Sequence, residues 1–102
     1  MEQEKSFKRW YDRDETVSYM VKLMEQCDDK LQVECAKIII EKAKEYGVKI
    51  TDNELEETVK SFFRRWYDKN KVVQEAFEYL RQSSFDVQKG IAFTIIEKIQ
   101  DL

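Results

Sequence analysis

The sequence predicts an all-α protein built from two similar helical units, and three observations carry this prediction. The 102 residues include two glycines and no proline, so the usual turn residues of β-rich architectures are scarce. Apolar residues recur at helical spacing along the chain. A six-residue motif at residues 7–12 returns at residues 63–68, an offset of 56.

The 56-residue offset extends well beyond the motif. Residues 4–46 align with residues 60–102 without a gap and share 13 identities in 43 positions, against about three expected from ordinary composition. We therefore expect an internal duplication inside a single all-helical domain that spans residues 1–102. The two units would pack as a compact helical bundle about a pseudo-two-fold axis, or stack as a short superhelix.

The first short helix of each unit is expected over residues 15–26 and 71–82. Asp14 and Asn70 align with each other, and both are good N-cap residues, because their side chains accept hydrogen bonds from unpaired backbone N–H groups. Each helix has an apolar stripe with i, i+3, i+4, i+7 spacing. The stripes are Val17, Met20, Val21 and Met24 in one unit, and Val73, Ala76, Phe77 and Leu80 in the other.

The second helix of each unit is expected over residues 29–46 and 85–101, with Asp28 and Ser84 as N-caps. Gly47 is expected to end the first of these helices, because glycine tolerates the left-handed conformation found there. Gly90 interrupts the other one, either to allow a close helix crossing or with no effect.

A longer leading helix is expected before the second motif. Thr51 and Glu54 have capping-box spacing, and the helix would run from there to the Arg-Trp-Tyr-Asp sequence. Its counterpart in the first unit, roughly residues 2–11, is shorter. The prediction is thus six helices in two units of three.

Composition argues against several classes of function. The net charge is −3, with 10 basic and 11 acidic residues in 1–51 and 8 and 10 in 52–102, so no basic region attracts nucleic acid. The chain has no histidine, which removes the commonest general base and the commonest transition-metal ligand. We expect no catalytic residues, no metal site, no cofactor and no enzyme activity.

The two cysteines, Cys27 and Cys35, fit no metal or redox motif. They are most simply reduced core residues of a cytoplasmic protein, although a single disulfide between them is an alternative. No apolar run approaches the roughly 20 residues of a transmembrane helix, so no membrane association is expected.

The repeated motif is the candidate interaction surface, here called the motif surface. It consists of Arg9, Trp10, Tyr11, Arg64, Arg65, Trp66 and Tyr67. One hypothesis makes the basic residues phosphate contacts and the aromatic rings stacking platforms for nucleic acid. A second and favoured one places the tryptophans in the core, and a third makes the tyrosines anchors of a protein interface.

By elimination, the sequence favours a small protein-interaction module without catalytic activity. The partner would be another protein or a second copy of the chain. The alternative is a nucleic-acid-associated protein that uses the two Arg-Trp-Tyr segments.

Overall fold

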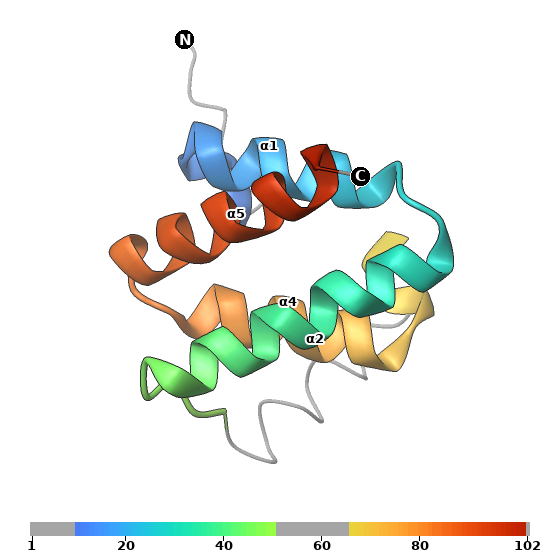
Figure 1. Ribbon diagram of the computed structural model, residues 1–102. Helices are drawn as coiled ribbons and strands as arrows, with labels where there is room; N and C mark the ends of the chain where they lie inside the picture. The colour runs from blue at the N-terminus through green and yellow to red at the C-terminus, as the bar shows by residue number, and fades with distance from the viewer. Residues whose placement is uncertain (1–9, 51–65, 102) are drawn as a thin grey trace, which may run out of the picture.

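Four α-helices and two 3-10 helices make up the part of the chain that the structure describes. The structure is a computed structural model, and it describes residues 10–50 and 66–101. Within these ranges every regular element is helical (Figure 1). The elements are η2 (Trp10–Arg13), α1 (Glu15–Glu25), α2 (Asp29–Glu45), η3 (Trp66–Lys69), α4 (Lys71–Gln82) and α5 (Phe85–Gln100).

Each α-helix packs mainly against a helix from the other half of the chain. Helix α1 lies beside α5, and α2 lies beside α4, so the helices form two pairs (Figure 1). Helices α2 and α5 also contact each other and join the pairs. Exchanging α1 with α4 and α2 with α5 maps these contacts onto one another, and the two halves share one hydrophobic core.

The all-α prediction is confirmed, but the described residues contain four α-helices rather than six. The two leading helices were expected largely over residues 1–9 and 51–65, which lie outside the described residues. Where those helices were expected to end, the chain forms the short 3-10 helices η2 and η3. The next residues, Asp14 and Asn70, have extended backbone conformations, which separates each 3-10 helix from the α-helix after it.

All four predicted N-caps are confirmed. The Asp14 side chain accepts hydrogen bonds from the backbone N–H groups of Thr16 and Val17, at 2.8 and 3.0 Å. Asn70, Asp28 and Ser84 cap α4, α2 and α5 in the same way. Since an N-cap typically contributes about 1 kcal/mol, these residues define where each helix begins.

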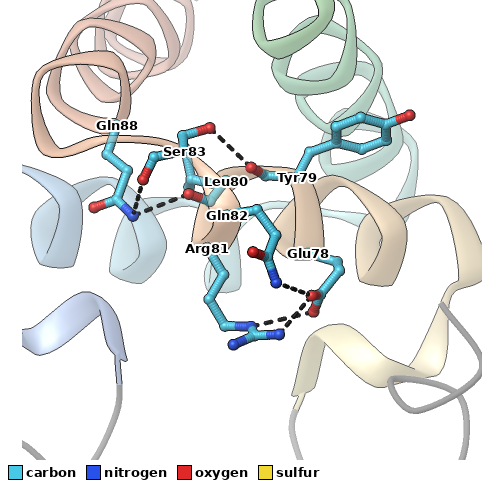
Figure 2. A network of polar contacts seen from close by, with 7 residues as sticks. All are labelled: Glu78, Tyr79, Leu80, Arg81, Gln82, Ser83 and Gln88. Carbon is cyan, nitrogen blue, oxygen red and sulfur yellow. Dashed lines mark hydrogen bonds and ion pairs between the residues drawn. The ribbon is translucent and has the colours of Figure 1, made fainter. Parts of the chain in front are cut away.

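A glutamine side chain holds each turn between consecutive helices. Gln88 Nε2 donates to the carbonyl oxygens of Leu80 and Ser83 at 2.9 and 3.3 Å (Figure 2). Gln32, 56 positions earlier, donates to the carbonyls of Met24 and Cys27 at 3.0 and 3.2 Å. The two glutamines, identical in the alignment, therefore each bind two carbonyls at the end of the preceding helix, one of which also accepts a backbone N–H, from Cys27 or Ser83.

The two predicted apolar stripes form the centre of the core. All eight of their side chains are at most 1% exposed. Helix α2 also carries a polar stripe that faces solvent, while Cys35 and Ile39 are buried. The stripe consists of Lys30, Glu34, Lys37, Glu41 and Lys44. The periodicity of the sequence thus identified the buried face of the short helices correctly.

The two glycines have different roles. Gly47 has a φ of +82°, and the bonds from Val48 N–H to Ala43 C=O and from Gly47 N–H to Lys44 C=O close a Schellman motif at the end of α2. Gly90 lies inside α5, and a Cβ added there would meet nothing within 4 Å. The close crossing considered for Gly90 is therefore not found among the described residues.

We predict that alanine has opposite effects at the two glycines. Gly47→Ala should lower the free energy of unfolding by about 1 kcal/mol, because an L-residue is strained in the left-handed region. Gly90→Ala should raise it by about 0.5–1 kcal/mol, because alanine is the better residue inside a helix. Urea unfolding followed by circular dichroism measures both. Destabilisation by Gly90→Ala would contradict the open surroundings of Gly90.

Candidate functional site

The two copies of the repeated motif meet in the structure around one phenylalanine of α4. Trp10 and Trp66 both lie close to Phe77, with ring centroids 6.3 and 5.5 Å away and ring planes nearly perpendicular to it. Tyr67 packs on the same ring at 4.3 Å. Edge-to-face aromatic pairs are favourable beyond the area they bury. The motif thus brings the beginnings of α1 and α4 to one aromatic cluster.

Burial separates the tyrosines of the motif surface from its tryptophans. Tyr11 and Tyr67 are 4% and 3% exposed, so their rings lie in the core and offer no open face for stacking or docking. Trp10 and Trp66 are half-buried and pack against the core. The three arginines, at 9, 64 and 65, lie outside the described residues. Among the described residues of the motif surface, only the two indole rings are therefore partly exposed.

A shallow aromatic hollow lies between α1 and α5, and sequence reasoning missed it. Its volume is about 300 Å³, and we call it the aromatic hollow. Its lining residues are Glu15, Thr16, Tyr19, Phe93, Ile96 and Gln100. The amide of Gln100 donates to the Tyr19 hydroxyl at 3.2 Å and ties the end of α5 to α1. Tyr19 and Phe93 are 47% and 57% exposed, although both are large aromatic residues.

The sequence did contain a signal for this hollow. In the 56-residue alignment, Phe93 stands opposite Lys37, and Tyr19 stands opposite Glu75. Lys37 belongs to the polar stripe of α2, so its counterpart on α5 also points outward. An aromatic residue at a position where the other half carries a charge identifies an exposed aromatic side chain.

A second and more polar cavity, here called the turn cavity, lies between the α1–α2 turn and the beginning of α4. Its volume is about 420 Å³. Its lining includes Glu25, Cys27, Asp29, Trp66, Lys69 and Asn70. The indole Nε1 of Trp66 is buried and has no hydrogen-bond partner among the described residues.

Both thiols are poor nucleophiles in this fold. Burial, followed by the charge of Asp28, raises the pKa of Cys27, and Cys27 Sγ donates to the Leu23 carbonyl at 3.2 Å. Cys35 is fully buried, and burial, followed by the neighbouring Cys27, raises its pKa from 9.0 to about 11. Both cysteines are free thiols. A reactive cysteine requires a lowered pKa, which neither thiol has. Cys35 is a small core residue, as predicted, whereas Cys27 is half-buried and lines the turn cavity, so its placement in the core was wrong.

One buried carboxylate, Glu78 on α4, has its charge compensated locally. It accepts hydrogen bonds from Arg81 and from Gln82 Nε2, the latter at 2.9 Å (Figure 2). A buried charge that is paired and hydrogen-bonded is tolerated in a core. We therefore assign Glu78 to the architecture of α4.

The comparisons with known proteins do not assign the chain to a family. No protein-family model, no curated protein and no solved structure matches it. In the described ranges, no three acidic, cysteine or histidine side chains lie together in a way that could hold a metal ion. None of the helices there is long and apolar enough to cross a membrane.

We predict that Phe77 is a major contributor to stability. Phe77→Ala should lower the free energy of unfolding by about 3–5 kcal/mol, because it leaves a cavity between Trp10, Trp66 and Tyr67. Phe77→Leu, which keeps most of the volume, should cost clearly less. Chemical denaturation followed by tryptophan fluorescence measures both variants. Equal and small losses would show that the aromatic cluster contributes little.

We also predict a loss of stability at alkaline pH that depends on Cys35. Its pKa of about 11 in the folded protein lies above its ordinary value of 9.0, so the folded state holds this proton more tightly than the unfolded chain. Stability from this group is complete below pH 9 and falls as the pH rises toward 11, by about 2 kcal/mol. The free energy of unfolding, measured across this pH range, should fall less steeply for Cys35→Ala than for the wild type. Parallel curves would contradict the prediction.

Proposed function

We propose that this protein is a protein-interaction module without catalytic activity, and that its partner covers the aromatic hollow. The observation that supports this most is the exposure of Tyr19 and Phe93 on neighbouring helices, where Ile96 lines the same hollow. Tyrosine and phenylalanine are enriched in the cores of protein interfaces. An apolar segment of a partner would remove both rings from water.

The geometry of the aromatic hollow favours insertion of an apolar side chain. The two rings come from α1 and α5, which pack against each other, so the contact between these helices fixes where the rings lie. The rim is polar, with Glu15 and Thr16 on α1 and Gln100 on α5. An apolar centre with a polar rim is the usual anatomy of a protein interface.

The nucleic-acid alternative has less support. Two of the four aromatic rings that would stack on bases, those of Tyr11 and Tyr67, are buried, and the net charge of −3 opposes phosphate binding.

We also infer that the two halves descend from one duplicated unit. The matched N-caps and the equivalent hydrogen bonds of Gln32 and Gln88 support this inference, together with the 13 identities. The inference concerns origin, and the proposed function does not depend on it.

We predict that Phe93→Ser abolishes partner capture and leaves the fold intact. A tagged wild-type chain should recover a stoichiometric protein from nuclease-treated native lysate, identified by mass spectrometry, and Phe93→Ser should lose it. Tyr46→Ser is the matched control, because Tyr46 is 60% exposed and does not line the aromatic hollow. Circular dichroism checks that both variants are folded.

Two results would contradict this prediction. If Phe93→Ser still captured the partner, the interface would lie outside the aromatic hollow. If nuclease treatment removed the captured material, the nucleic-acid alternative would be favoured. Light scattering at several concentrations distinguishes a partner from a second copy of the chain. If the wild type were a dimer and Phe93→Ser a monomer, the partner would be a second copy of the chain.

A further inference from the structure

The turn cavity carries an unbalanced negative charge that the proposed function does not use. Two carboxylates, Glu25 and Asp29, line it together with one basic residue, Lys69. None of these three forms an ion pair within 4 Å in the described part of the chain. The indole of Trp66 forms part of the wall. Carboxylates next to an aromatic ring suit a cation better than an anion.

The equivalent region of the other half is already occupied by cations of the chain itself. Arg13 lies over the ring of Phe85, with its guanidinium carbon 5.7 Å from the ring centroid. Lys89 Nζ reaches the carboxylate of Asp14 at 3.6 Å. These contacts bring an arginine and a lysine to the place where α5 begins beside α1.

In the 56-residue alignment, Lys69 of the turn cavity is the counterpart of Arg13, but the cavity has no counterpart of Lys89. Lys89 stands opposite Val33, so the turn cavity has no lysine from α2 to reach the beginning of α4. Phe85 is matched by Asp29, and exposed Arg81 by exposed Glu25. These differences give the turn cavity a net negative charge, where the equivalent region of the other half has a net positive one. They also leave the cavity unfilled.

We propose that the turn cavity binds an organic cation, a primary ammonium or guanidinium group on a short alkyl chain, between Glu25, Asp29 and the indole of Trp66. The volume of about 420 Å³ lies within the range of small-molecule sites and exceeds what a single such group needs. The carboxylates would pair with the charged group, and the indole would attract it through its ring. Lys69 opposes binding and sets a limit to the affinity.

Two sources could supply this chemistry. A free diamine would enter as a small molecule, and a lysine or arginine of a partner protein would enter as a side chain. The same contacts recognise both, so the test includes one probe of each kind.

The test is an NMR titration of the full ¹⁵N-labelled chain with putrescine and, separately, with acetyl-Gly-Lys-Gly-amide. We expect the Trp66 indole N–H signal to shift in a saturable way, while that of Trp10, which lies outside the turn cavity, stays in place. Sodium chloride at matched ionic strength is the reference. Tighter binding of putrescine would identify a free amine as the ligand, and tighter binding of the peptide would identify a partner's side chain.

Three variants test the assignment of residues. Glu25→Gln combined with Asp29→Asn should weaken binding about fivefold, and Lys69→Met should strengthen it. Glu97→Gln is the matched control, because it removes one exposed carboxylate that does not line the turn cavity and should leave binding unchanged. The proposal is overturned if the Trp66 shift equals that in sodium chloride, or if Glu97→Gln weakens binding as much as the double variant.

Discussion

The structure depends first on the packing of two distant segments against a single ring. Trp10 and Trp66 are 56 residues apart in the chain, yet both contact Phe77, which is itself 1% exposed. Because each tryptophan begins the 3-10 helix that leads into α1 or α4, the aromatic cluster brings the segments before these two helices together. The cross-pairing of α1 with α5 and of α2 with α4 then buries the apolar stripes of both halves in one core.

The polar interactions within each half are short-range and satisfy the ends of the helices. N-caps bind the first backbone N–H groups, while Gln32 and Gln88 bind carbonyls at the preceding turns. Even Cys27 and Ser83 are equivalent, since each donates to the carbonyl four residues earlier. Because these bonds satisfy the helix ends within each half, the outward-facing residues are not needed for this purpose and can differ between the halves.

The candidate sites lie where the halves differ. Phe93 takes the place of an exposed lysine and contributes to the aromatic hollow, whereas Asp29 takes the place of Phe85 and gives the turn cavity one of its carboxylates. The same backbone arrangement thus presents an aromatic surface on one side and an acidic cavity on another. Positions that differ between the aligned halves thus contribute to both candidate sites, while the residues common to both halves mainly build the fold.

The sequence by itself determined the helical class, the four N-caps, the buried faces of α1 and α4 and the left-handed end of α2. Each of these follows from local periodicity, or from a side chain that bonds to backbone within a few residues. The contacts of the motif were decided by the tertiary structure alone, because Trp10 reaches Phe77 of α4 only after the two halves have packed into one core. The aromatic hollow and the turn cavity likewise required the tertiary structure. Their walls come from helices distant in the chain, and pairing between distant helices depends on how whole faces fit together.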